Sequence, residues 1–149
     1  MRIPILLLCV FLVSCGGNAS EERKNGYSET PKNDEDSLFQ EVMNQHDLAM
    51  SKMGKLAGYR KQFVSKIDSV KKLKAPVKQP VIKTYEQLTF QLKEAEDQMN
   101  GWMQQFSIDT LQDNPHIRMQ YLESEKLKVT TIKEEILSVL SRADSVLKK

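Results

Sequence analysis

A long row of residues spaced three and four apart limits what this chain can fold into. The row occupies residues 39–70, and the same spacing recurs in residues 81–106 and, less regularly, in residues 122–146. Alternating steps of three and four mark one face of a helix that packs against other helices. No stretch alternates apolar and polar residues with the period of two that is typical of strands. The sequence therefore predicts an all-α fold.

Most members of the three rows are apolar, as the residues of a bundle core should be. The first row is Phe39, Val42, His46, Ala49, Met53, Leu56, Arg60, Phe63, Ile67 and Val70. The second row is Val81, Tyr85, Leu88, Leu92, Ala95, Met99, Trp102 and Phe106. The third row is Leu122, Glu125, Val129, Ile132, Ile136, Val139, Ala143 and Val146. Three such helices joined by short loops predict an up-down-up three-helix bundle of long, coiled-coil-like helices.

Capping residues and prolines set the expected ends of the helices. Ser37 and Gln40 have the spacing of a capping box, which places the first helix at about 37–73. Pro76 ends that pattern, and the second helix is expected at about 78–106. Asp113 or Asn114 should cap a third helix that covers about 115–147. Two glycines in the first helix, at 54 and 58, are expected where another helix comes close.

The first residues have the order of a secretory signal peptide. Arg2 precedes an apolar run from Ile3 to Val13, which is roughly half the length of about 20 residues that a transmembrane helix needs. The segment Leu12-Val13-Ser14-Cys15 resembles the bacterial lipobox. The resemblance implies removal of residues 1–14 and attachment of diacylglycerol, with a further acyl chain such as palmitate, to Cys15. The alternative is an ordinary exported cysteine.

The rest of the composition agrees with a tethered helical domain. Residues 15–36 contain Tyr27 as their only large apolar group and are expected to form a flexible tether after the lipidated cysteine. Residues 37–149 are expected to form the bundle. The only other cysteine, Cys9, would leave with the signal peptide, so no disulfide is expected. The net charge of +2 falls to +1 without Arg2. That balance argues against nucleic acid as a partner.

One candidate site emerges when the helices are aligned by their rise per residue. An antiparallel alignment brings Trp102 near Ser51, and Phe106 near Asp47, while Met119 of the third helix falls near His46. One end of the bundle then holds the methionines that follow the signal peptide: Met43, Met50, Met53, Met99, Met103 and Met119.

Two interpretations of this cluster stay open. Methionine fills irregular gaps in cores and packs well against aromatic rings. Alternatively, thioether and imidazole groups suit Cu(I) or Ag(I), and an adjacent tryptophan can contact a soft cation with its ring face. The residues of such a metal site would be His46, Met50, Met53, Met99, Trp102 and Met103. No other cofactor is indicated.

The same segments carry a family resemblance. The patterns His46-Asp47-x-x-Met50-x-x-Met53 and Met99-x-x-Trp102-Met103-x-x-Phe106 resemble small helical lipoproteins of Bacteroidota that are labelled viral A-type inclusion protein-like. The resemblance implies a coiled-coil fold and no biochemical activity.

Catalytic chemistry is not indicated elsewhere in the sequence. Neighbouring carboxylates, Glu94 with Glu96 and Glu134 with Glu135, are interpreted as solvent-exposed helix faces, and no nucleophile is accompanied by a base. We therefore expect a non-enzymatic binding or structural module of the cell envelope. The protein would be anchored to the membrane by its lipid, and we expect the outer rather than the inner membrane. Its expected partner is another protein of the cell envelope.

Overall fold

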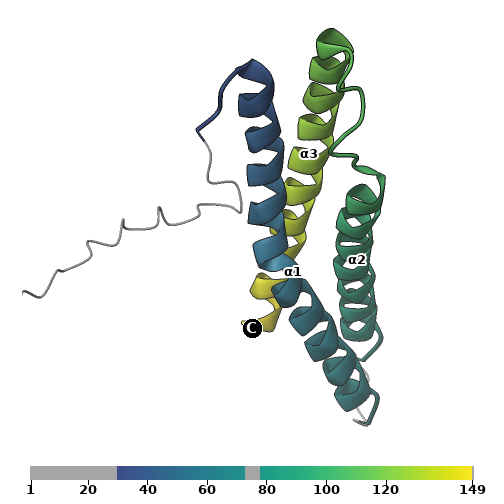
Figure 1. Ribbon diagram of the computed structural model, residues 1–149. Coiled ribbons are helices and arrows are strands. Elements are labelled where there is room, and N and C mark those ends of the chain that lie inside the picture. Colours follow the sequence, from purple (N-terminus) through teal and green to yellow (C-terminus); the bar gives the residue numbers. More distant parts are fainter. Residues whose placement is uncertain (1–29, 73–77, 149) are drawn as a thin grey trace, which may run out of the picture.

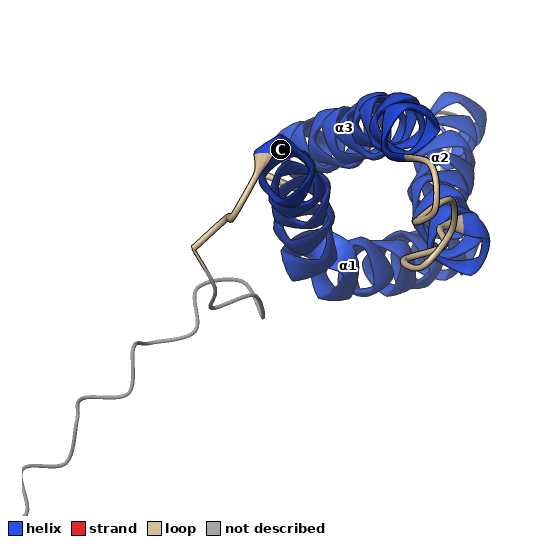
Figure 2. Cartoon of the chain, turned by 45° about the horizontal axis from the view of Figure 1, so that its top comes forward, coloured by secondary structure: helices blue, strands red, loops and turns tan. Residues whose placement is uncertain are grey.

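The protein is a bundle of three helices in which each helix runs antiparallel to the one before it in the chain, as the spacing predicted. The computed structural model describes residues 30–72 and 78–148, with α1 at Asp34–Lys72, α2 at Lys78–Gln105 and α3 at Pro115–Leu147 (Figure 1). In Figure 1, α1 and α3 run in the same direction and α2 runs against them. Seen toward one end, the three helices surround a common axis (Figure 2). Within the described ranges no residue is in a strand, which confirms the all-α, up-down-up three-helix fold.

The core is built almost entirely from the three predicted rows. Its fully buried members come from all three helices: Val42, Ala49, Leu56, Phe63, Leu92, Met99, Leu122, Val129, Ile136 and Ala143. Two buried apolar residues, Ile82 and Leu140, lie beside the rows rather than in them. Full burial of one such large side chain favours folding by about 1.5–3 kcal/mol. Burial of these rows therefore holds the helices together.

The beginning of α1 differs from the prediction. The helix starts at Asp34, and its cap is Asn33, whose Oδ1 accepts a hydrogen bond from the backbone N of Asp36 at 2.8 Å. Ser37 lies inside the first turn and donates its hydroxyl to the carbonyl of Asn33 at 3.0 Å. Ser37 is therefore not the cap. An asparagine cap followed by three acidic residues suits the positive end of the helix dipole, and this stabilises the earlier start.

The beginning of α3 agrees with the prediction. Asn114 is the cap, and its Oδ1 accepts a hydrogen bond from the backbone N of Ile117 at 3.2 Å. Pro115 opens the helix, where its missing N–H costs nothing. The loop before it turns at Leu111, which has a positive φ of 63°. The connection between α1 and α2 consists of residues 73–77, which lie outside the described residues.

The helical glycines do not mark a close approach of two helices. A Cβ added at Gly54, Gly58 or Gly101 would meet no atom within 4 Å. The expectation that Gly54 and Gly58 lie where another helix comes close is therefore wrong. Both positions have room for a side chain, because the neighbouring helices pack against the other faces of α1.

Candidate functional site

Aromatic rings from all three helices gather at the end of the bundle where α1 begins. We call this cluster the aromatic end; it consists of Phe39, His46, Trp102, Phe106 and Tyr121. The ring of Phe106 stacks on Trp102 with centroids 4.8 Å apart, on Tyr121 at 6.1 Å and on Phe39 at 6.2 Å. The imidazole of His46 lies 5.7 Å from the indole of Trp102. The sequence predicted the contact between the His46 and Trp102 segments but not the ring stack around Phe106.

A buried carboxylate supports the aromatic end from α3. Glu125 is 5% exposed, and the indole Nε1 of Trp102 donates a hydrogen bond to its Oε2 at 2.8 Å. Lys128 donates to its Oε1 at 2.7 Å, and this contact raises the pKa of the Lys128 ammonium. Glu125 interrupted the third row in the sequence. The interruption was the signal of a buried polar contact, because a charged group in a core needs partners.

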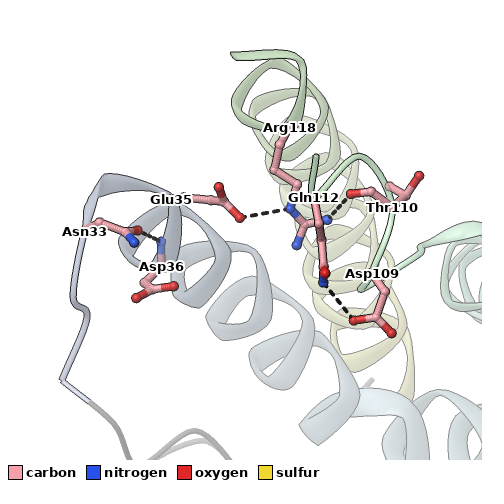
Figure 3. A network of polar contacts seen from close by, with 7 residues as sticks. All are labelled: Asn33, Glu35, Asp36, Asp109, Thr110, Gln112 and Arg118. Carbon is pink, nitrogen blue, oxygen red and sulfur yellow. Dashed lines mark hydrogen bonds and ion pairs between the residues drawn. The ribbon is translucent and has the colours of Figure 1, made fainter. Parts of the chain in front are cut away.

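A buried arginine joins the same end to the loop between α2 and α3. Arg118 is 4% exposed; its Nε donates to Glu35 of α1 at 3.1 Å, and its Nη1 donates to the carbonyl of Thr110 at 2.8 Å (Figure 3). In the loop, Gln112 donates to Asp109 at 3.1 Å (Figure 3). Arg118 thus connects the first turn of α1 to this loop. Sequence reasoning missed it, since arginine at the start of a helix usually faces solvent.

The candidate metal ligands are spread from the core to the surface. Met99 is fully buried, Met53 and Met103 are partly buried against the core, and Met50 is 36% exposed. His46 is half-buried, and its Nδ1 lies 2.9 Å from a carboxylate oxygen of Asp47. The described residues contain no group of three or more His, Cys, Asp or Glu side chains placed to hold a metal ion.

The axial alignment of the helices differs from the expected one. Trp102 lies against His46 rather than Ser51, and Phe106 lies against Phe39 rather than Asp47. The α3 helix is displaced further. Because Arg118 contacts Glu35, its neighbour Met119 lies about 16 Å along the bundle from His46 and not beside it. The six methionines are therefore not all at the same position along the bundle axis, although the sequence had led us to expect this.

A second candidate site is an open groove along the surface between α2 and α3. We call it the α2–α3 groove. One part has a volume of about 570 Å³, and the adjoining part has about 350 Å³. Gln98 and Glu135 line both parts, so the two are continuous. Trp102 and Ile132 lie at the floor of the larger part, and Leu127, 70% exposed, lies at its edge.

No pattern in the sequence indicated this groove, because most of the residues that line it are polar. An amphipathic pattern assigns polar residues to solvent and does not show which of them face each other across two helices.

Cys15, the predicted lipidation site, and the rest of the segment from Leu12 lie outside the described residues. None of the described helices is long and apolar enough to cross a membrane.

Comparison of the chain with protein-family models, with curated proteins and with solved structures finds no match. The structure itself defines the class of protein, a three-helix bundle of long helices. The function has to be inferred from the groove, the aromatic end and the N-terminal sequence.

Proposed function

We propose that the chain is a lipid-anchored protein of the cell envelope that acts without catalysis, by binding another envelope component through its helical bundle. The N-terminal segment supports the anchor, and two or more acyl chains on Cys15 would hold the protein stably at a membrane. The observation that carries the binding function is the α2–α3 groove. Clefts between the helices of a bundle are common binding sites in proteins of this architecture.

The composition of the groove suits binding. Its larger part combines an apolar floor at Trp102 and Ile132 with a few polar groups from Gln98, Lys128 and Glu135. Sites that bind through shape usually have such an apolar surface and a small number of oriented polar groups. Leu127 adds an exposed apolar side chain at the edge of the groove. An exposed apolar surface with a polar rim is typical of a contact site.

The anchor can be tested with one substitution and one control. Cells that express the protein are labelled with an alkyne analogue of palmitate. Cys15→Ala should abolish labelling, because only the Cys15 sulfur can accept the diacylglycerol. Cys9→Ala should label normally, since Cys9 lies in the segment that is removed. Equal labelling of Cys15→Ala and the unmodified chain would refute the anchor, and fractionation of the membranes would test the preference for the outer membrane.

The binding function can be tested by site-specific crosslinking in cells. A photoreactive amino acid replaces Leu127 at the edge of the groove or, as the control, Leu48 on α1. Both positions are exposed leucines, Leu127 at 70% and Leu48 at 55%. A discrete adduct with an envelope protein should form from position 127 and not from position 48. If neither position forms one, or both form the same adducts, the groove is not the binding site.

A second candidate function is binding of Cu(I) or Ag(I) near the aromatic end. The observation that favours it is the contact between the rings of His46 and Trp102, since a tryptophan face beside an imidazole suits a soft cation. Titration with Cu(I) under reducing conditions should then raise the melting temperature and change Trp102 fluorescence. His46→Ala should remove both effects. His116→Ala, which changes an exposed histidine in the first turn of α3, should keep them. No change in either signal would eliminate this candidate.

A further inference from the structure

The α2–α3 groove is bordered by two rows that repeat the spacing of the core. The row on α2 is Gln91, Glu94, Gln98, Gly101 and Gln105. The row on α3 is Lys128, Thr131, Glu135, Ser138 and Arg142. In both rows the steps alternate three and four, which is the spacing that lets one helix pack along another. These rows are distinct from the apolar rows of the core, and they give α2 and α3 a second face suited to a helix.

The dimensions of the groove fit a helix. Each row spans about 21 Å at 1.5 Å per residue, or four turns of helix. The row on α2 has no side chain at Gly101, where an added Cβ would meet nothing within 4 Å, and the row on α3 has the small residue Ser138. Small residues allow a third helix to lie close to both walls, at the distances of 8–10 Å that are usual between helix axes.

The polar groups of the groove are rich in acceptors at its centre. The side-chain oxygen Oε1 of Gln98 is buried and has no hydrogen-bond partner among the described residues. Glu94 and Glu135 line the same part of the groove, and no described residue forms an ion pair with either of them. Of the two cations in the rows, Lys128 is already bound to Glu125. Arg142 lines the same part of the groove as the two carboxylates, and no ion pair joins it to either of them. A buried acceptor without a donor is costly, so an occupant that brings a donor would be stabilised there.

We propose that the groove receives one amphipathic helix of a partner protein, which places a lysine or arginine against Gln98, Glu94 and Glu135. One or two turns away, the same helix places a large apolar side chain against Trp102, Ile132 and Leu127. The proposal deepens the proposed function, on which it rests, by naming the chemistry of the partner. The cationic group satisfies the buried acceptor and two carboxylates, and the apolar group covers exposed apolar surface.

The test uses a display library of helical peptides and the full-length protein in lipid nanodiscs. The peptides have 21 residues, and the positions of one heptad face are randomised. We expect the selected peptides to carry lysine or arginine at a central position of that face and large apolar residues about one heptad away. Selected peptides with aspartate or glutamate at the centre, or no selected peptides at all, would overturn the proposal.

Two matched variants locate the binding site. Gly101→Leu should fill the groove and weaken binding of the selected peptides by about tenfold or more, as loss of a central contact does. Gly54→Leu changes a glycine of the same kind on α1 and should leave binding unchanged. Circular dichroism verifies that both variants stay helical. Peptides that bind the wild type and Gly101→Leu equally well would show that the groove is not their site.

A charge exchange tests the recognition chemistry without filling the groove. Glu135→Lys should weaken binding of a peptide with a central lysine, and replacing that lysine by glutamate should restore it. Failure of the exchange to restore binding would overturn the role of the central cation. Sedimentation of the wild type as a dimer that Gly101→Leu separates would identify a second copy as the occupant and also overturn the proposal. Palmitate labelling and crosslinking in cells report on the anchor and the binding function separately.

Discussion

Polar groups are used differently in the two halves of the bundle. At the aromatic end they lie inside: Glu125 and Arg118 are buried, and each is held by two partners. The opposite half, which contains Leu56, Phe63 and Leu92, has an apolar interior, and its polar contacts are exposed or only partly buried. We call this part the apolar half.

The difference shows what each half depends on. Burial of apolar surface is not directional, so the stability of the apolar half depends on how much apolar surface its side chains remove from water and how completely they fill the core. A buried charge is tolerated only with correctly placed partners, so the aromatic end depends on particular pairs of atoms. Removal of a side chain should therefore have different consequences in the two halves.

The largest effect is expected in the apolar half. Leu92 is fully buried, and Leu92→Ala should lower the free energy of unfolding by about 2–5 kcal/mol through lost contacts and the cavity left behind. Phe90→Ala is the control on the same helix, since Phe90 is 66% exposed, and it should change stability by less than about 0.5 kcal/mol. Urea denaturation measures both. Similar losses for the two variants would mean that burial does not distinguish these positions.

At the aromatic end, the loss should depend on the partner left behind. Trp102→Phe removes the indole donor from Glu125 and should cost about 1–3 kcal/mol, since a buried acceptor loses a partner. Adding Glu125→Leu should recover part of that loss, because the stranded carboxylate is then absent. A double-mutant cycle in urea gives the coupling. Additive losses would show that Glu125 is not coupled to Trp102.

The glycines allow a smaller, stabilising change that touches neither interior. Gly54→Ala adds a methyl group in open space and should raise the free energy of unfolding by about 0.5–1 kcal/mol through its helix propensity. Gly101→Ala should act in the same way, because its position in the groove is also open. Thermal and urea denaturation measure the change. A destabilised Gly101→Ala alone would indicate that something already occupies the groove.

The smallest effect on stability is expected from the surface contacts of the apolar half. Tyr59 donates to Asp144, as does Lys55 at 3.1 Å, and the Tyr59 hydrogen bond is the main reason that the pKa of Asp144 is lowered below its usual 3.8. A carboxyl whose pKa is lower in the folded than in the unfolded chain stabilises the fold above the unfolded value. That contribution is lost as the pH falls through the folded value.

Tyr59→Phe is the variant that tests this contact. It should raise the pKa of Asp144 toward 3.8, because the largest cause of the shift is removed. NMR titration of the side-chain carboxyl carbon measures the change, with Tyr85→Phe as the control on α2. An unchanged titration of Asp144 would show that Tyr59 does not govern it.

Much of the fold could be predicted from the spacing of apolar residues, because the buried face and the ends of a helix depend on residues that are close in sequence. The rows from Phe39, Val81 and Leu122 define the buried face of each helix, and that face depends only on 3.6 residues per turn. Asn114 and Pro115 determined the start of α3, because a cap acts within one turn. At α1 the same reasoning selected Ser37 where Asn33 forms the cap, since two capping patterns overlap within four residues.

Only the tertiary structure decided how the helices are aligned along the bundle. A row with heptad spacing still faces its neighbour after a slip of seven residues, so spacing cannot distinguish two such alignments. The true alignment places Phe106 against Phe39, eight residues before the expected Asp47. It also brings together groups far apart in sequence: Arg118 with Glu35, and Gln98 with Glu135 in the groove. The sequence by itself determined the faces of the helices, and packing between helices determined which residues meet across them.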